Sequence, residues 1–540
     1  MSGPFLLSHL VAEAAQRDPA AAAVRSTDGA LTYGELDAAT ARLAATLGGL
    51  GVRRGDRVGL YLHKSVAAYV AVHAVLRAGA AYVPIDPLAP PAALAAVATD
   101  CGIEVLVSDA RHQRLLAELA ASGRSPVRCV VGAGPVEGLR TVSGAEVDDA
   151  DVASWRPPKV LSDDLAYVMV TSGSTGRPKG LMHTHRSGLS YARLAARTYG
   201  VRPEDRLANS APFHFDISTF ELFAGPLAGA STLVIAEPYL KLPASLSQLV
   251  AEDRSTFWYS VPFLLSELAL RGALDQRDLG ALRWVLFGGE VADPGVLRTL
   301  MGHMPNARFS NSYGPAEVNQ CTYWHLPGPP ANGESIPIGR PWGDAEVAVV
   351  DERRELVAPG EVGELVVRTS TMMEGYWGRP DLDAAAFVHR SLPGGRTSRW
   401  YATGDLVRQR DDGVLEFLGR RDHQVKVRGN RVELESVESV LASLDGIDQA
   451  VAAVVDVEGS TAVLAGVTAR PGAALDLDAA LRAVAEQLPP YAVPYRLVPL
   501  GPLPLTASGK VDRRAVRADL ARRADTGTPI KPVPTEGATP

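Results

Sequence analysis

The sequence predicts an α/β protein in which buried, mostly parallel sheets are layered with helices. Short apolar runs such as VGLYLH (58–63), YVPID (82–86), VLVSD (105–109) and YVMVTSG (167–173) alternate with alanine- and leucine-rich stretches of helical character. The chain has 540 residues, whereas a single hydrophobic core usually stops growing at about 250–300 residues. We therefore expect two or more folding units.

A change in the pattern of predicted strands and helices along the chain indicates the domain boundaries. Residues 1–421 are predicted to form a large N-terminal domain, whose last part, from about 340, contains short alternating strands (AEVAVVDE, GELVVRT and VLEFLGR) typical of an antiparallel, barrel-like subdomain. Residues 422–522 combine strands (QVKVRG, AVAAVVDV) with helices (VESVLASL, LDAALRAVAEQL) and predict a small, mobile α+β domain. Residues 523–540 are rich in Pro, Thr and Gly and predict a disordered tail.

Composition excludes several classes of partner. The net charge is −7, the pI is about 5.9 and no basic domain is visible, so a nucleic-acid partner is not expected. No apolar run is long enough to cross a bilayer, so a membrane partner is not expected either. Cys101, Cys129 and Cys321 form neither a metal-type spacing nor a disulfide framework, which favours a reducing, cytoplasmic location.

Lysine is scarce in this chain. Only seven of the 54 basic residues are lysines, so arginine carries the general surface charge. A retained lysine is then expected to do something that a guanidinium cannot. Lys179, Lys426 and Lys510 lie in motifs described below, whereas Lys64 and Lys531 lie outside any motif and are interpreted as surface residues.

The stretch TSGSTGRPKG (171–180) follows a predicted strand and concentrates glycines, hydroxyls and Lys179. Glycines allow a tight turn, and free N–H groups with hydroxyls can converge on phosphate oxygens. The residue order differs from that of the P-loop NTPases, G-x-x-x-x-G-K-[ST]. Taken alone, the stretch predicts either a phosphate-binding loop or a flexible polar turn.

Further motifs resolve this choice through a resemblance. TSGSTGRPKG resembles the phosphate-binding signature of the adenylate-forming superfamily, which contains acyl-CoA synthetases, luciferases and the adenylation domains of nonribosomal peptide synthetases. The other motifs occur in the order of that family: LTYGEL (31–36), LRAGAAYVPIDP (76–87), FDIS (215–218), NSYGPAE (311–317), GELVVR (363–368), YATGDLVR (401–408), GRRDHQVKVRGNRVELESVE (419–438) and LPLTASGKVDRR (503–514). FDIS, DHQVKVRG and TASGKVDRR are most similar to the branch that adenylates amino acids.

The resemblance implies ATP and Mg²⁺ as cofactors and assigns roles to matching residues. The catalytic residues would be Lys510, Glu317 and Thr171, with Glu317 also holding Mg²⁺. The ATP-binding residues would be Thr171, Ser172, Gly173, Ser174, Thr175, Gly176, Lys179, Tyr313, Gly314, Asp405 and Arg420. Asp422 would be the hinge of the C-terminal domain. The family usually has Thr where this chain has Ala316, so one hydroxyl contact near the phosphates is missing, at a cost of about 1 kcal/mol.

Asp216 of FDIS lies among Phe213, Phe215 and Ile217, and a carboxylate in apolar surroundings needs a cationic partner. The resemblance assigns it to the ammonium group of an amino-acid substrate. The alternative from the residues themselves is helix capping, because Ser218 and Glu221 form a capping-box pattern that predicts a helix start.

The pocket positions of the family map onto a set of residues that is uncharged apart from Asp216. We therefore expect a neutral substrate side chain. Phe220, Tyr259 and Phe287 are bulky and favour a small one, as in proline, a small α-amino acid or a short β-amino acid; the alternative is that they line a wider cavity. The predicted set is Asp216, Ile217, Phe220, Tyr259, Val285, Phe287, Ser312, Gln320 and Cys321.

The resemblance implies a two-step reaction in natural-product (antibiotic) biosynthesis. An amino acid is activated as aminoacyl-AMP and then transferred to the phosphopantetheine thiol of a carrier protein. No carrier-type serine motif and no HHxxxDG motif occurs, so we expect a stand-alone ligase with a separate carrier protein; the sequence leaves open whether a small helper protein takes part. The alternatives are an acyl-CoA ligase for a non-amino acid and, given Ala316, a non-catalytic scaffold.

Overall fold

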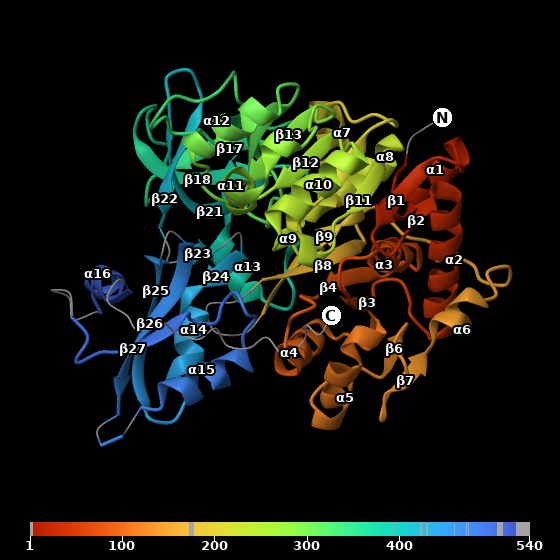
Figure 1. The fold of residues 1–540 in the computed structure, drawn as a ribbon, viewed down its shortest axis with the longest axis horizontal. Coiled ribbons are helices and arrows are strands. Elements are labelled where there is room, and N and C mark those ends of the chain that lie inside the picture. The colour runs from red at the N-terminus through yellow and green to blue at the C-terminus, as the bar shows by residue number, and fades with distance from the viewer. Residues whose placement is uncertain are drawn as a thin grey trace. The chain divides into compact units, whose positions relative to one another are not determined.

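The computed structural model describes residues 4–171, 178–391, 394–421, 424–427, 430–457, 460–470, 472–473, 475–504 and 511–524. The chain divides into two compact units that separate in sequence near residue 422 (Figure 1). The larger, N-terminal unit contains layered sheets and helices, and the smaller unit is α+β, as the sequence predicts.

The first sheet of the large unit has eight strands. In spatial order they are β19 (Gly375–Tyr376), β9 (Lys179–Thr184), β8 (Leu165–Thr171), β4 (Ala81–Pro84), β3 (Arg57–Tyr61), β5 (Val105–Ser108), β6 (Cys129–Val131) and β7 (Arg140–Val142). The strands from β8 to β7 in this order are parallel to one another. At the other edge, β9 pairs antiparallel with β8, and β19 pairs antiparallel with β9. The apolar runs at 58–63, 82–86, 105–109 and 167–173 contribute β3, β4, β5 and β8.

The second sheet has nine strands. Their order is β16 (Arg340–Pro341), β15 (Thr322–His325), β14 (Arg308–Tyr313), β13 (Trp284–Gly288), β12 (Phe257–Ser260), β10 (Arg206–Asn209), β11 (Ser231–Val234), β1 (Ala22–Ser26) and β2 (Gly29–Thr32). The strands from β14 to β1 are parallel, and antiparallel strands close both edges. Buried parallel strands account for the continuous apolar runs in the sequence.

Helices cover both sheets. They are α1 (Leu10–Arg17), α2 (Tyr33–Gly49), α3 (Val66–Arg77), α4 (Pro91–Cys101), α5 (Gln113–Ser122), α6 (Gly144–Asp148), α7 (His185–Tyr199), α8 (Gly225–Ala228), α9 (Glu237–Leu240), α10 (Pro243–Asp253), α11 (Pro262–Arg271), α12 (Pro294–His303) and α13 (Pro380–Ala386). The LTYGEL motif starts α2 with a capping box, because Thr32 Oγ1 accepts from the Glu35 N–H and Glu35 Oε2 accepts from the Thr32 N–H.

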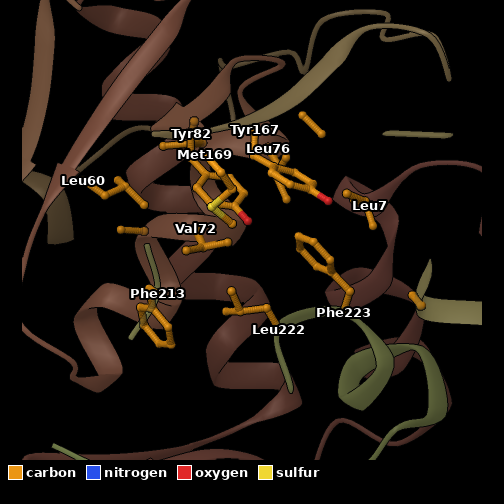
Figure 2. Packing of buried hydrophobic residues seen from close by; sticks show 14 of the residues in the cluster. Leu7, Leu60, Val72, Leu76, Tyr82, Tyr167, Met169, Phe213, Leu222 and Phe223 are labelled. Carbon is orange, nitrogen blue, oxygen red and sulfur yellow. The ribbon is translucent and has the colours of Figure 1, made fainter. Parts of the chain in front are cut away.

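An aromatic core joins the two sheets. Tyr82 and Tyr167 of the eight-stranded sheet stack with their ring centroids 5.4 Å apart, and Phe223 lies 5.8 Å from Tyr167. Figure 2 shows these rings with Phe213 and Leu222 around α3. Phe223 belongs to a π-helical turn, Phe220–Ala224, in the connection from β10 to β11. The segment that carries FDIS is therefore packed against the other sheet.

The barrel-like region is a five-stranded antiparallel sheet. It consists of β17 (Glu346–Val350), β18 (Val362–Arg368), β21 (Thr397–Gln409) and β20 (Phe387–Ser391), with β22 (Leu415–Arg420) paired to β21.

The smaller unit has its own core. It contains β23 (Gln424–Val427), β24 (Asn430–Glu433), α14 (Leu434–Ala442), β25 (Ile447–Val457), β26 (Ser460–Ala469), α15 (Leu477–Ala485), β27 (Arg496–Pro499) and α16 (Arg513–Ala524). Arg513 forms a bidentate ion pair with Glu438, which ties α16 to α14. Three predicted features lie outside the described residues: the hinge Asp422, the catalytic residue Lys510 and residues 525–540 of the tail.

None of the helices in the described ranges is long and apolar enough to cross a membrane.

The packing around β3 gives a test of stability. A Cβ added at Gly59 would lie 2.4 Å from Leu106 Cδ2, and Leu106 is fully buried. We expect Gly59→Ala to lower the free energy of unfolding by about 1–3 kcal/mol through overpacking. Gly49→Ala at the end of α2 is the matched control, because nothing lies within 4 Å of its added Cβ. Calorimetric melting of both variants checks this; an unchanged melting temperature for Gly59→Ala would contradict it.

Candidate functional site

Asp405 is a buried carboxylate that accepts hydrogen bonds from a guanidinium group and from a hydroxyl group. It lies on β21, directly opposite Arg420 of β22. Arg420 donates to Asp405 Oδ1 at 2.6 Å, and the Tyr313 hydroxyl donates to Oδ2. Burial, followed by the nearby Asp405 charge, raises the pKa of Tyr313 well above its ordinary value, so the phenol stays protonated. Three sequence-predicted ATP ligands thus meet at one point.

Tyr313 ends β14 and opens a tight loop that returns at Cys321. The Cys321 N–H donates to the Tyr313 carbonyl at 2.9 Å, which closes the loop. Within it, a Cβ on Gly314 would lie 2.3 Å from the Asn319 carbonyl oxygen, so no larger residue fits without moving the backbone. Asn319 itself has a φ of +62°.

Glu317 lies fully buried in this loop. Its Oε1 accepts from the Tyr376 hydroxyl at 3.1 Å, and its carbonyl accepts from the Met373 N–H at 2.7 Å. The carbonyl of Ala316 lies 3.0 Å from His183 Nε2, on β9. Burial lowers the pKa of His183 to about 4, so the ring is neutral and Nε2–H is the donor. His183 and Tyr376, which sequence reasoning missed, therefore hold the backbone and side chain of the predicted metal ligand.

The described ends of the phosphate motif are the paired residues Thr171 on β8 and Lys179 on β9. The Thr171 hydroxyl oxygen is buried, and no group of the described part of the chain hydrogen-bonds it. Ser172, Gly173, Ser174, Thr175 and Gly176 lie outside the described residues.

Asp216 begins a short 3₁₀ turn, Asp216–Ser218, and its Oδ1 accepts from the Ile217 N–H at 3.0 Å. The capping box expected at Ser218 is wrong. Ser218 Oγ donates to the carbonyls of Phe213 and Phe215 at 3.3 and 2.6 Å. Thr219 Oγ1 donates to the Asp216 carbonyl at 2.5 Å. Hydroxyl groups thus lock the backbone of this turn and leave the Asp216 carboxylate partly exposed.

Glu221 and Lys64 form a buried polar network behind Asp216. Asn209 links them, because its Nδ2 donates to Glu221 Oε2 at 3.0 Å and its carbonyl accepts from Lys64 Nζ at 2.7 Å. Burial raises the pKa of Glu221 to about 8 and lowers that of Lys64 to about 7. The interpretation of Lys64 as a surface residue is wrong, since its side chain is 3% exposed.

Phe220 follows Asp216 closely in the chain and forms, with Tyr199 and Tyr259, a cluster that we call the aromatic wall. Phe220 packs edge-to-face on Tyr259 at 5.9 Å and on Tyr199 at 6.1 Å. Burial raises the pKa of Tyr259 well above its ordinary value, so the phenol stays protonated. Ile217, the neighbour of Asp216 in the chain, belongs to the same cluster. The structure therefore brings together Ile217, Phe220 and Tyr259 from the predicted pocket, with Asp216 next to Ile217 in the chain.

Val285 and Phe287 do not share this wall. They point from β13 into a different core cluster, whereas Leu286 belongs to the cluster of Phe220 and Tyr259. A Cβ at Gly288 would lie 3.6 Å from the Tyr259 hydroxyl. The assignment of Val285 and Phe287 to the wall of Phe220 and Tyr259 is therefore wrong. Alternate residues of a strand face opposite sides, so a one-residue offset exchanges the two faces.

Ser312, Gln320 and Cys321 come from β14 and the end of its loop. The Ser312 hydroxyl lies 3.0 Å from the Tyr199 hydroxyl, which accepts from Gln320 Nε2 at 3.1 Å. Cys321 Sγ is buried 3.6 Å from the Tyr313 carbonyl, where the loop closes. Tyr199 lies at the end of α7, outside every motif, so no local sequence signal could have found it.

Comparison with known protein families decides the class. A family model described as AMP-binding enzyme matches residues 11–377, and one described as AMP-binding enzyme C-terminal domain matches residues 436–510. The chain belongs to the AMP-binding enzyme family.

Relatives and solved structures agree with this family. An L-proline–[L-prolyl-carrier protein] ligase of Pseudomonas fluorescens is 36% identical over 96% of this chain and 99% of the relative. A Streptomyces coelicolor ligase of the same name is 36% identical over 91% and 93%. A solved NRPS protein containing adenylation and PCP domains matches with 27% identity and a TM-score of 0.79, over 95% of this chain and 84% of that chain.

The buried Glu221 predicts a specific pH dependence. Its ordinary pKa is 4.5 and its folded pKa is about 8, so the stability that its neutral form contributes at pH 4.5 is lost as the pH rises through 8. Glu221→Gln stays neutral, so we expect this variant to become progressively more stable than the wild type between pH 5.5 and 8.5.

Thermal midpoints of both proteins across that range measure the difference. Glu118→Gln, an exposed change on α5, is the control and should show no trend. A difference between Glu221→Gln and wild type that stays constant with pH would contradict the prediction.

Proposed function

We propose that this enzyme activates a small neutral amino acid as aminoacyl-AMP and transfers it to the phosphopantetheine thiol of a carrier protein. The observation that carries the proposal is the position of Asp216: a hydroxyl-locked turn presents its carboxylate beside a pocket wall of uncharged aromatic residues. A carboxylate at such a place suits an ammonium group. The chain is an amino-acid adenylating ligase, a class in which the similar prolyl-carrier protein ligases also belong.

The nucleotide fits the residues around Tyr313. Tyr313 and Arg420 both donate to the carboxylate of Asp405, which fixes its orientation, and an ionised carboxylate is an acceptor suited to the two hydroxyls of a ribose. Gly314 lets the loop backbone approach the nucleotide closely, and the buried hydroxyl of Thr171 lacks a partner among the described residues. Bound ATP would supply the phosphorus that the substrate carboxylate attacks.

Glu317 would hold Mg²⁺, a hard ion that prefers oxygen ligands. Within the described ranges no group of three or more His, Cys, Asp or Glu could form a metal cage. A magnesium ion at Glu317 would therefore take most of its ligands from phosphate oxygens and water, as Mg²⁺ commonly does. His183 and Tyr376 orient this loop in the absence of the usual Thr at position 316.

The remaining residues position charge. Asp216 orients the amino acid so that its carboxylate points away from the aromatic wall. Lys179 adds positive charge at the base of the phosphate motif. Lys510 would neutralise the charge that develops between the carboxylate and the α-phosphate, since positioning and electrostatics dominate such transfers.

The second step needs a different arrangement of the C-terminal domain. We propose that residues 422–522 turn about Asp422, so that Lys510 leaves and the DHQVKVRG segment takes part in thiol transfer. The names of the similar ligases specify a prolyl-carrier protein as acceptor. Proline, small α-amino acids and short β-amino acids are the candidate substrates.

Amino-acid-dependent ATP–pyrophosphate exchange tests the function. We expect exchange with at least one member of a panel of proline, small α-amino acids and short β-amino acids. Asp216→Asn should lower it about 100-fold or more, because the amide cannot pair with the ammonium group. Asp275→Asn, at a side chain that is 93% exposed, is the matched control. No exchange with any amino acid, but activity with a non-amino acid and CoA, would favour the acyl-CoA ligase.

Lys510 separates the two steps. We expect Lys510→Ala to lower adenylation about 100-fold or more, because one preorganised charge near the reacting atoms commonly has this effect. Transfer from preformed aminoacyl-AMP to the carrier thiol should stay near the wild-type rate in a single-turnover assay. Lys241→Ala, at an exposed position, is the control. Equal loss of both steps would refute the assignment.

A further inference from the structure

A directed chain of hydrogen bonds runs along the pocket wall. Gln320 Nε2 donates to the Tyr199 hydroxyl at 3.1 Å and reaches the Thr322 carbonyl at 3.5 Å, so both of its N–H groups are used. Tyr199 accepts this bond and therefore donates its own proton to Ser312 Oγ, 3.0 Å away. The Thr322 carbonyl can only accept, which fixes which end of the Gln320 amide is the oxygen.

The oxygen of that amide is left without a donor. Gln320 is 2% exposed, and its Oε1 has no hydrogen-bond partner in the part of the chain that the structure describes. A buried acceptor without a partner is unfavourable because its hydration is lost without compensation, and such atoms are rare in native proteins. An unpaired buried acceptor beside a substrate pocket indicates a donor that arrives with the ligand.

The position of the amide relative to Asp216 limits what this donor can be. Asn319, the neighbour of Gln320 in the chain, donates to Thr219 Oγ1 at 3.0 Å, and Thr219 Oγ1 donates to the Asp216 carbonyl at 2.5 Å. The segment that carries the orphan oxygen is therefore tied by hydrogen bonds to the turn that carries Asp216, and Tyr199 packs on Phe220, which follows that turn. In the proposed function the ammonium group of the substrate is bound at Asp216. The donor for Gln320 Oε1 must therefore come from the substrate's side chain.

We propose that Gln320 Oε1 accepts a hydrogen bond from the substrate side chain, so that the enzyme selects a small amino acid bearing a hydroxyl group. Tyr199 is the positioning residue, because it anchors the amide nitrogen and turns the oxygen toward the ligand. Serine has the required neutral donor, whereas alanine, proline and 2-aminobutyrate lack it. This inference rests on the proposed function.

Paired isosteres in the ATP–pyrophosphate exchange assay test the proposal. Serine and 2-aminobutyrate differ by a hydroxyl in place of a methyl group. We expect serine to exceed 2-aminobutyrate about 10- to 100-fold in kcat/KM, the factor that a buried hydrogen bond provides. Gln320→Leu should bring this ratio down to about one. Tyr199→Phe should lower it in part, because the amide loses its anchor.

The ratio of the two kcat/KM values, rather than the total activity, is the readout, since a merely structural role would lower kcat/KM for both substrates alike. Gln248→Leu, an exposed glutamine on α10, is the matched control and should leave the ratio unchanged. Thermal melting establishes that each variant is folded. A wild-type preference for proline, alanine or any amino acid without a side-chain donor overturns the proposal, as does an unchanged ratio in folded Gln320→Leu. Absence of exchange with every amino acid would instead overturn the proposed function itself.

Discussion

The segment between β10 and β11 is held between the two large sheets, and the geometry of the site depends on this constraint. Phe223 packs on Tyr167 of the eight-stranded sheet, while Phe220 packs on Tyr259 of the nine-stranded sheet. Both rings belong to the π-helical turn Phe220–Ala224, and each packs into a different core cluster. Asp216 lies immediately before this turn, so its position is set by packing on both sides.

Buried polar groups complete what the aromatic packing begins. Asn209 joins Glu221 to Lys64. Asn319 donates to Thr219, the residue that follows the Asp216–Ser218 turn, at 3.0 Å. The second bond connects the loop of Glu317 to the turn of Asp216. Because buried hydrogen-bonded networks permit few alternative arrangements, the turn of Asp216 and the loop of Glu317 are fixed with respect to each other.

Most of the fold was predictable from local patterns. The parallel strands produce continuous apolar runs and the five-stranded sheet produces alternating ones, so both sheet types were visible in the sequence. The motifs of the nucleotide site were equally visible, since Tyr313, Asp405 and Arg420 each lie in a recognisable stretch. Their convergence on one carboxylate follows from strand pairing, which places Arg420 opposite Asp405.

By itself the sequence determined the fold class, the order of the units and the motifs that predict nucleotide and amino-acid binding. These features depend on periodicity and on short motifs, which are local along the chain. The tertiary structure decided which face of β13 packs on Phe220 and Tyr259, whether Lys64 is buried and that Tyr199 reaches Gln320. Each of these depends on the side to which a side chain points or on contacts between residues more than a hundred positions apart, and neither is encoded in any single stretch.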